Sequence, residues 1–405
     1  MREMKDSGID TVGLVPKHWK ETRLKYLCKV ETGNEDTQNA NPDGEYPFYV
    51  RSPIVERCDR YTFDGEGILV AGDGAGAGRV FHHVQGKYAV HQRVYRLSHF
   101  KYNANFMYYF VSNLFPHEMD KGSAQSTVPS MRLPMLLNFK LFLPPDGETE
   151  KIICFLNYKC VEIDVLTADI QTQIDTLEQY KRSIITEAVT KGLNPDVEMK
   201  DSGVFYMAPM NAKWRLTKIG YICTKLSRLF KPEDTALICS NSGKVLVRPD
   251  DVTGKMVSDD NAMQGIHAGD IAIHGMDTWH GAIALSDYDG KITRVVHVCD
   301  STEDKRFIVY YLQHLAFQGV YKLISNGVRG NTSDFRSWDK VSDIWIAIPK
   351  IKEEQKNICD YLDRQCKSIE KVIAEKKEQL EVLDEYKKSL IYEYVTGKKE
   401  VPENA

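Results

Sequence analysis

The sequence contains a long internal repeat. The hexapeptide EMKDSG occupies residues 3–8 and recurs at residues 198–203, an offset of 195, and at the same offset four later residues recur: Trp19, Thr22, Tyr26 and Cys28 return as Trp214, Thr217, Tyr221 and Cys223. Residues 173–190 match residues 379–396 at an offset of 206, with nine of eighteen positions identical. A period near 200 residues is too long for a solenoid, so we predict one domain-plus-helix unit duplicated within the chain. Such pseudo-two-fold symmetry suits a partner or ligand with two similar halves.

Composition places the chain among ordinary globular proteins. Its 405 residues can hold at least two domains, and 42% hydrophobic with 27% charged residues is typical of them. The longest apolar stretch, residues 106–115, is too short to cross a bilayer, and residues 2–6 are charged rather than the start of a signal peptide. We therefore expect a cytoplasmic protein without membrane contact. The nine cysteines include no Cys-x-x-Cys pair, which favours reduced structural thiols over a zinc site.

Hydrophobic periodicity divides each copy into a globular part and a helix. Short β-rich runs, a helical run and a closing apolar strand follow one another twice, which predicts an α+β fold for each globular part. We expect a first globular domain at residues 1–145, a long helix at 146–192, a second globular domain at 193–350, a long helix at 351–397 and a tail at 398–405. The net charge of −4 does not indicate nucleic-acid binding, but both helical segments are acidic, so any positive surface lies on the globular parts.

Each helical segment carries a heptad pattern. Position a holds Ile163, Ile170, Leu177 and Ile184 in the first and Ile369, Lys376, Leu383 and Leu390 in the second; position d holds Leu166, Gln173, Tyr180 and Glu187, then Val372, Gln379, Tyr386 and Glu393. A helix of about 40 residues is roughly 60 Å long, too long to pack on one small domain, so we expect the two helices to pair. The glutamine that recurs at d would then fix their register.

Most motifs with catalytic associations fail on their context. The glycine run at residues 72–78 satisfies neither nucleotide-binding pattern and precedes a strand-like segment, so a hairpin held close to another backbone is the better interpretation. Residues 41–44 form a turn rather than an adenine-methyltransferase motif, and residues 303–305 are too short to indicate a nuclease. His274 and His280 have no clear third metal ligand. The sequence therefore predicts no catalytic residues and no metal site.

What remains is a set of polar loops whose side chains are of the types that read base edges. Arginine and lysine pair with guanine, asparagine and glutamine with adenine, and serine and threonine with either. The candidates in the first copy are Arg79, His91, Gln92, Arg93, Lys121, Gln125, Ser126 and Thr127; those in the second are His274, Trp279, Arg294, Asn326, Arg329, Asn331, Thr332 and Arg336. Any one of these alone is most simply an ordinary loop residue. The equivalent placement of two such loops, each between the helical run and the closing strand, favours a DNA-reading surface.

Several of these segments resemble the specificity subunit of type I restriction-modification systems. The resemblance rests on the MKDSG opening followed by a tryptophan and RLKYL (residues 23–27), the GSAQ loop, LPP before a helix, and the helix end EQYKRSIITEAVTKG. It covers essentially the whole chain, although the second copy has FYMAPMNAKW at its entry to Trp214. The resemblance implies two target recognition domains, each reading half of a bipartite sequence in double-stranded DNA, and two helices that form an antiparallel coiled coil.

The same resemblance implies partners and cofactors. The subunit is not an enzyme; it docks two methyltransferase subunits, and restriction subunits join the complete complex. S-adenosylmethionine, ATP and Mg²⁺ would be bound by those partners, and no cofactor by this chain. We expect the docking surface at the repeated helix ends, at Tyr180, Lys181, Ser183, Tyr386, Lys387 and Ser389. The tyrosines could instead fill the seam of the coiled coil.

Two readings from other classes remain open on the residues alone. An endonuclease or fused restriction enzyme with two DNA-binding domains would need a catalytic carboxylate cluster and would cut DNA with Mg²⁺ present. A coiled-coil scaffold whose globular ends bind protein would lack salt-dependent DNA affinity. The recognised bases and the length of the spacer cannot be read from the sequence.

Overall fold

The computed structural model describes residues 2–122, 129–249, 262–325 and 334–402. The chain divides into two compact units. The first unit contains residues 1–170 together with residues 377–405, and the second contains residues 171–376. The side chain of Lys121 and the candidate residues Gln125, Ser126, Thr127, Asn326, Arg329, Asn331 and Thr332 lie outside the described part of the structure.

Two four-stranded sheets form the body of the first unit. One has the order β6-β5-β10-β7 and the other the order β4-β11-β8-β9. Their strands are β4 (Lys29–Thr32), β5 (Tyr46–Tyr49), β6 (Val55–Cys58), β7 (Phe63–Asp64), β8 (Gly67–Ala71), β9 (Phe81–Val84), β10 (Lys87–Val90) and β11 (Val94–Ser98). The continuous apolar run of β8 is buried at all five positions because this strand lies between β11 and β9.

A helix and three short additions complete this unit. The helix α2 (Ala104–Gly122) buries Phe106, Phe110 and Leu114 at helical spacing. The ring of Trp19 meets Phe106 edge to face, with centroids 6.1 Å apart. The closing strand β12 (Lys140–Leu143) pairs with β3 (Lys20–Arg23), so the beginning and the end of the globular part meet. The remaining elements are β1 (Met4–Asp6), β2 (Leu14–Pro16), α1 (Leu24–Leu27), the 3-10 turn η1 (Thr37–Asn39) and α3 (Leu133–Asn138).

The second unit repeats this order. Its sheets have the orders β18-β17-β22-β19 and β16-β23-β20-β21, and β24 pairs with β15. The strands are β13 (Met199–Lys200), β14 (Met210–Asn211), β15 (Arg215–Lys218), β16 (Cys223–Lys225), β17 (Ala236–Ser240), β18 (Lys244–Val247), β19 (Met263–Ile266), β20 (Ile271–His274), β21 (Ile283–Leu285), β22 (Gly290–Thr293), β23 (Val296–Ser301) and β24 (Trp345–Ile348), with helical turns α5 (Ile219–Ile222), η3 (Thr278–His280) and α8 (Trp338–Ser342). Trp214 packs on Phe307 edge to face, as Trp19 does on Phe106.

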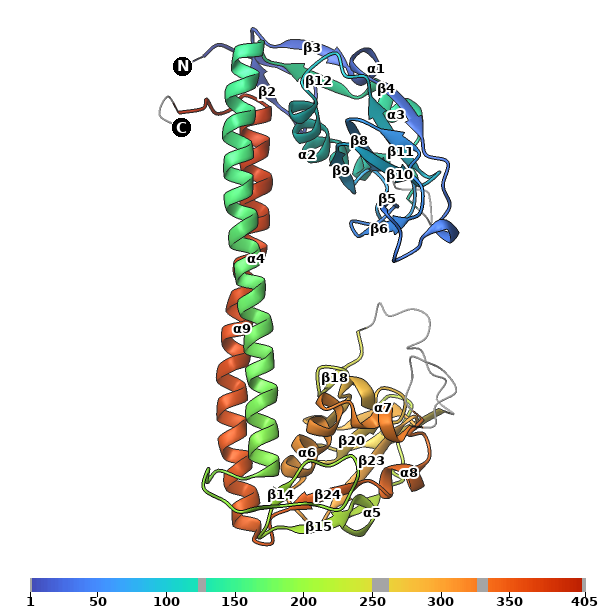
Figure 1. Ribbon diagram of the computed structural model, residues 1–405, viewed down its shortest axis with the longest axis vertical. Coiled ribbons are helices and arrows are strands. Elements are labelled where there is room, and N and C mark those ends of the chain that lie inside the picture. Colours follow the sequence, from blue (N-terminus) through green and yellow to red (C-terminus); the bar gives the residue numbers. More distant parts are fainter. Residues whose placement is uncertain (1, 123–128, 250–261, 326–333, 403–405) are drawn as a thin grey trace. The chain divides into compact units, whose positions relative to one another are not determined.

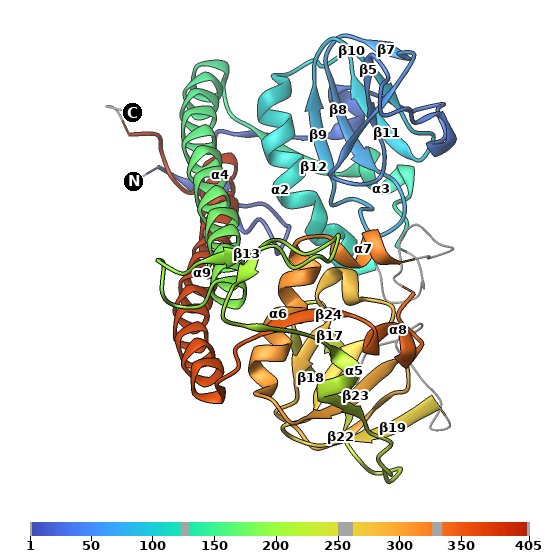
Figure 2. The same cartoon turned by 60° about the horizontal axis from the view of Figure 1, so that its bottom comes forward.

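The helical run expected at residues 304–324 is two helices, α6 (Lys305–Phe317) and α7 (Val320–Ile324). Gly319 separates them because its φ of +70° is a left-handed conformation that ends a helix. In each unit, the helix that follows the sheets lies between them and the long helices: α2 in the first, α6 in the second (Figure 2).

The two long helices are α4 (Asp146–Thr190, 45 residues) and α9 (Lys352–Val395, 44 residues). In the first unit the Phe155 ring lies 4.6 Å from that of Tyr394, and Asp164 pairs with Lys387. In the second unit Lys181 pairs with Glu370. Figure 1 shows α4 and α9 side by side within each unit. Within each unit, residues further along α4 contact residues that come earlier in α9, so the two helices pair antiparallel.

The seam between the helices runs along heptad positions a and e. In α4 Ile163, Ile170 and Ile174 are buried, whereas the d residues Leu166 and Tyr180 are 46% and 53% exposed. The prediction that position d lies in the seam is therefore wrong. A stripe of a and e residues alternates steps of four and three, as an a and d stripe does, so apolar residues at all three positions left the choice to packing.

The same choice is made in α9. Ile369 and Ile373 are buried there, while the d residues Val372 and Tyr386 are exposed. The recurring glutamines at d are exposed as well and do not fill the seam. The polar residues beside the seam are lysines: Lys181 and Lys387, both at position e, bind carboxylates of the facing helix. Because Lys181 corresponds to Lys387 and Asp164 to Glu370 at the offset of 206, the two ion pairs are equivalent.

Among the described residues no helix is long and apolar enough to cross a membrane. All nine cysteines are free thiols, and Cys154 alone among them is exposed.

Candidate nucleic-acid interface

The glycine run of the first unit connects β8 to β9 in a hairpin, as expected. Its glycines allow close backbone contacts: a Cβ on Gly72 would lie 2.9 Å from the carbonyl oxygen of Arg93, and one on Gly76 would lie 2.4 Å from that of Arg51. The run therefore serves to bring the chain at residues 51 and 93 against the hairpin. It precedes a strand and does not begin a helix, so it lacks the geometry of a phosphate loop.

Asp73 connects these two neighbouring segments through its side chain. Its Oδ1 lies 3.0 Å from Nη1 of Arg51, and its Oδ2 lies 3.3 Å from Nη1 of Arg93. The arginine side chains are 44% and 64% exposed, and that of Asp73 is 19% exposed. Arg93 was a sequence candidate, but Arg51 was not. Arg51 is far from the other candidates in the sequence, and an arginine that follows a strand carries no signal by itself.

The residues on either side of 123–128 contact the same glycine run, residues 72–79. Arg79, which ends the glycine run, pairs with Asp120 near the end of α2. On the other side, the oxygen of Pro129 accepts the N–H of Gly74 at 3.0 Å, and the N–H of Met131 donates to the oxygen of Gly72 at 2.8 Å. Asp120 and Pro129, which flank residues 121–128, therefore both contact the glycine run that ends at Arg79.

His91 and Gln92 form the turn between β10 and β11. His91 is buried, and its Nδ1 accepts the N–H of Arg93 at 3.0 Å. Burial lowers the pKa of His91, and the charge of Arg51 lowers it further. Gln92 is exposed, and its Nε2 donates to Asp36 at 2.7 Å. These contacts give His91 a structural place beneath the arginines and leave Gln92 at the surface.

The second unit is built in the same way around Gly275. Its N–H donates to the oxygen of Val295 at 2.9 Å, and its oxygen accepts the N–H of Phe335 at 2.9 Å. These bonds correspond to those that Gly72 makes with Arg93 and Met131. A Cβ on Gly275 would approach the Phe335 oxygen to 2.8 Å, so glycine is required here too. In both units the chain that returns from the loop after the helix therefore docks on a glycine at the end of a central strand.

The described candidates of the second unit lie around this glycine. Arg294 is exposed in the turn between β22 and β23, the place of Gln92 in the first unit, and its Nε donates to the Met263 oxygen at 2.9 Å. His274 ends β20; its Nδ1 accepts the N–H of Asp277 at 3.1 Å, and burial lowers its pKa against the effect of Asp277. Arg336 follows the docked Phe335, and its Nη2 lies 3.1 Å from Sδ of Met276.

Trp279 lies in η3, which follows β20 in the chain and packs against both α6 and α7. The Nζ of Lys322 lies 5.7 Å from the centre of its ring. Its indole N–H is buried and has no hydrogen-bond partner within the described part of the chain. The ring is only partly exposed, so it contributes more to packing than to the surface.

The predicted docking residues on the long helices divide into two kinds. Tyr180, Tyr386, Ser183 and Ser389 are exposed, and the alternative that the tyrosines fill the seam is wrong. Lys181 and Lys387 instead form the two equivalent ion pairs of the seam. In each unit the facing helix also has an exposed aliphatic residue at position d, Val372 in the unit of Tyr180 and Leu166 in the unit of Tyr386. The chain thus carries the same exposed aromatic and aliphatic pair twice.

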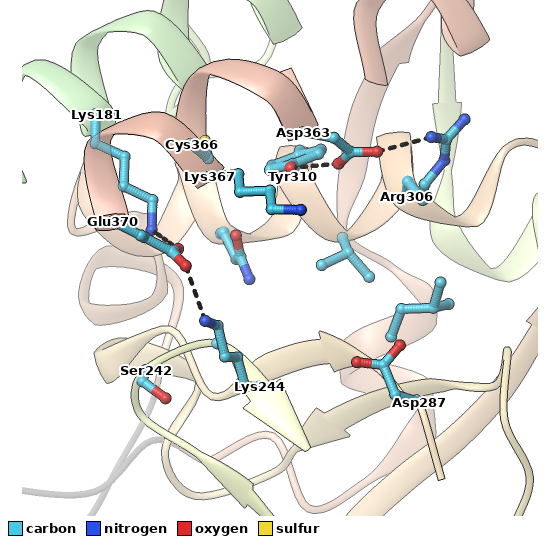
Figure 3. Close-up of a pocket in the computed structure, with 14 residues that line it drawn as sticks. Lys181, Ser242, Lys244, Asp287, Arg306, Tyr310, Asp363, Cys366, Lys367 and Glu370 are labelled. Atoms are coloured by element: carbon cyan, nitrogen blue, oxygen red, sulfur yellow. Dashed lines mark hydrogen bonds and ion pairs between the residues drawn. The ribbon is translucent and has the colours of Figure 1, made fainter. Parts of the chain in front are cut away.

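A cavity of about 460 Å³ lies within the second unit between α6, α9 and the β17-β18 hairpin (Figure 3). At one end Glu370 accepts from both Lys181 and Lys244; burial raises its pKa, but these two hydrogen bonds lower it below the usual value. At the other end Asp363 binds Arg306 and the Tyr310 hydroxyl, each at 2.7 Å. These contacts fix the globular part of the second unit to the helices.

Among the described residues no three histidine, cysteine, aspartate or glutamate side chains are grouped so that they could hold a metal ion. The features that remain are exposed arginines around a glycine, built twice, and a twice-repeated exposed helix surface.

Comparison with known proteins gives consistent matches. Residues 16–183 match the family model of the type I restriction modification DNA specificity domain. The type I restriction enzyme EcoDI specificity subunit of Escherichia coli is 20% identical over 371 residues, which cover 85% of this chain and 77% of that protein. The MjaVIII specificity subunit of Methanocaldococcus jannaschii is 23% identical over 418 aligned residues, covering 95% and 93%.

A solved structure is also similar. It comes from work on complex assembly and conformational transition of the type I restriction-modification system, and it matches with a TM-score of 0.62. The match covers 95% of this chain and 99% of that one at 14% identity, so it supports the fold and not the chemistry of any residue.

Proposed function

We propose that the chain is a type I restriction-modification DNA specificity subunit, as its matched domain and its two relatives suggest, and that each of its two units recognises one half of a bipartite, asymmetric site in double-stranded DNA. Such a subunit is the non-catalytic component of the complex. In this proposal the globular parts, residues 1–145 and 193–350, are the target recognition domains. The helices at 146–192 and 351–397 space them, and residues 398–405 are a tail.

The observation that carries this proposal is the construction shared by Gly72 and Gly275. Each glycine hydrogen-bonds the chain that follows a polar loop. It also hydrogen-bonds the turn before the next long strand of the sheet, β11 in the first unit and β23 in the second. Arginine side chains lie exposed around both: Arg79 and Arg93 in the first unit, Arg294 and Arg336 in the second. Loops on a rigid scaffold can enter a DNA groove, and arginine is the usual partner of guanine and of phosphate. Two such surfaces that differ in sequence suit two different half-sites.

The helix surface supports a second part of the proposal. We infer that two methyltransferase subunits dock on it, one at Tyr180, Ser183 and Val372 and the other at Tyr386, Ser389 and Leu166. A surface that occurs twice under pseudo-two-fold symmetry is expected to bind two copies of one partner. An exposed tyrosine beside an aliphatic residue is a common anchor of protein interfaces. S-adenosylmethionine would reach the DNA on these partners, and ATP and Mg²⁺ on the restriction subunits that join them.

Co-expression with the cognate methyltransferase subunit tests the proposal. Sequencing that detects N6-methyladenine should find methylation within one motif of two short specified blocks around an unspecified spacer. A methylated continuous palindrome would contradict the assignment of one half-site to each unit. Absence of methylation with a partner that is competent on another specificity subunit would contradict it as well. The endonuclease alternative predicts cleavage of DNA by the isolated chain with Mg²⁺, which we do not expect.

A further inference from the structure

We propose that Asp73 is a positioning residue that aligns Arg51 and Arg93 for contact with DNA, and that Arg51 is a further residue determining the specificity of the first unit. This inference rests on the proposed function and names the cations that act in one half-site. The acceptors they fit are paired oxygen or nitrogen atoms, either guanine O6 and N7 or phosphate oxygens.

The backbone brings the three residues together independently of their side chains. Gly72 lies against the carbonyl of Arg93, and Gly76 lies against the carbonyl of Arg51; neither contact would tolerate a Cβ without a shift. Asp73 lies next to Gly72 in this run and also forms a β-bridge with Ser130, which follows the polar loop. The hairpin thus holds a carboxylate among three separate segments, and two of them supply an arginine.

The charges favour a ligand rather than a purely internal network. One carboxylate faces two guanidinium groups, so the cluster carries a net positive charge. Each guanidinium has about five N–H donors in a planar fork. Within the described residues, Asp73 is the only side chain that hydrogen-bonds or ion-pairs with either of them. Both arginines therefore keep most of their donors for a ligand, while Asp73 restricts their rotation before binding. A group fixed in advance loses less conformational entropy when it binds, which improves discrimination between bases.

The second unit replaces this arrangement. Met276 follows Gly275 where Asp73 follows Gly72, Val295 takes the place of Arg93, and the neighbouring cation is Arg336. The carboxylate with two arginines is thus a property of the first unit, and its loss should affect one half-site only.

The test uses the full chain in complex with its methyltransferase partner. The variants are Arg51→Ala, Arg93→Ala and Asp73→Asn. The matched control is Arg215→Ala. Arg215 lies on β15 of the other unit, is 42% exposed and pairs with one carboxylate, that of Glu303. Methylation rates are measured on duplexes with single substitutions in either block, and binding to an unrelated duplex is measured at several salt concentrations.

Each arginine variant should lower activity on the cognate duplex by about 10- to 100-fold. A base contact would reduce discrimination in one block only, whereas a phosphate contact would weaken binding to all duplexes and lower the salt slope by about 1. Asp73→Asn should reduce discrimination in the same block while it increases binding to the unrelated duplex, because it removes a negative charge. The control should match the unmodified chain.

These opposite changes separate alignment from a purely structural role. If Asp73→Asn lowers specific and unrelated binding together, the positioning role is refuted. If both arginine variants behave like Arg215→Ala while the unmodified complex methylates a bipartite motif, the inference fails and the proposed function stands. If the unmodified complex methylates no such motif, the proposed function fails.

Discussion

His314 offers a quantitative test of how the second globular part is fixed to the helices. It lies on α6, is 4% exposed, and its Nδ1 lies 3.0 Å from the hydroxyl of Thr186 on α4. Burial lowers its pKa from 6.5 to about 4, and no charged neighbour contributes to the shift. Asn113 occupies the corresponding place on α2 and donates to the Lys388 oxygen at 2.9 Å. His314→Asn is therefore a change for which the chain itself supplies the precedent.

The sign and size of the effect follow from proton linkage. The unfolded chain binds a proton at His314 below about pH 6.5, whereas the folded chain resists it until about pH 4. Stability that depends on His314 is therefore fully present above pH 6.5 and is lost as the pH falls. One pKa unit corresponds to about 1.4 kcal/mol, so the loss is about 1 kcal/mol at pH 5.5 and about 3 kcal/mol by pH 4.

The measurement is the difference in unfolding free energy of the second unit between the unmodified chain and His314→Asn. Urea unfolding or hydrogen exchange of residues 305–317 can follow it from pH 7.5 to pH 4. Other histidines with lowered pKa, such as His297, titrate in both proteins and cancel. Below pH 6.5 the unfolding free energy of the variant should rise steadily relative to that of the unmodified chain. The loss of the Thr186 contact adds a constant that does not change with pH. A difference that is constant across this range would refute the assignment of the shift to a buried, neutral imidazole.

Three further predictions concern the helices. Four helical residues inserted after Val189 should lengthen the helix by about 6 Å and change the unspecified DNA spacer, at about 3.4 Å per base pair, while both blocks stay the same; an active complex with the original spacer would show that the helices do not set the distance. Lys387→Asp should destabilise the first unit by about 1 kcal/mol, and adding Asp164→Lys should restore part of it in a double-mutant cycle; purely additive effects would mean that this ion pair does not couple the helices. Tyr180→Ala and Tyr386→Ala should each leave one methyltransferase copy bound and together leave none, as native mass spectrometry can count, whereas two copies on the double variant would place docking elsewhere.

The sequence predicted the duplication, the α+β units and the two long helices because each depends on local patterns. It misplaced the seam for a physical reason. Leu166 and Val372 are apolar and lie at heptad positions, yet they are exposed, while the seam includes partly buried lysines whose charges are satisfied by the facing helix. A hydrophobic pattern cannot distinguish an apolar residue that fills a seam from one that forms a binding surface.

The candidate interface was predicted only in part. The sequence named Arg79, Arg93 and Arg294 as candidates because they lie in polar segments, and the structure shows that all three are exposed. Arg51 was missed because its link to Arg93 runs through Asp73, and the three residues meet only when separate loops pack together. His91 looked like a surface residue in the sequence, but the turn that contains it places its ring in the interior. Composition of a loop predicts which chemistry is present, whereas exposure depends on the tertiary fold.

The pairing of the helices has a consequence for how the chain is made. The core of the first unit includes Leu390, Ile391, Tyr394 and Val395, which belong to the last turns of α9, and the hydroxyl of Tyr392 donates to the oxygens of Thr11 and Val12. On the ribosome these residues emerge more than 200 residues after the end of the first segment at residue 170. At about 5 to 20 residues per second the delay is on the order of 10 to 40 seconds.

During that delay the part of the chain made first cannot complete its core. The second unit needs only residues 171–376 and can finish earlier. The first unit, which is made first, is therefore completed last, and until α9 is made the Phe155 ring on α4 lacks the Tyr394 ring against which it packs. We expect the chain to depend most on chaperones during this interval, and a chain whose synthesis stops before residue 390 lacks part of the core of the first unit.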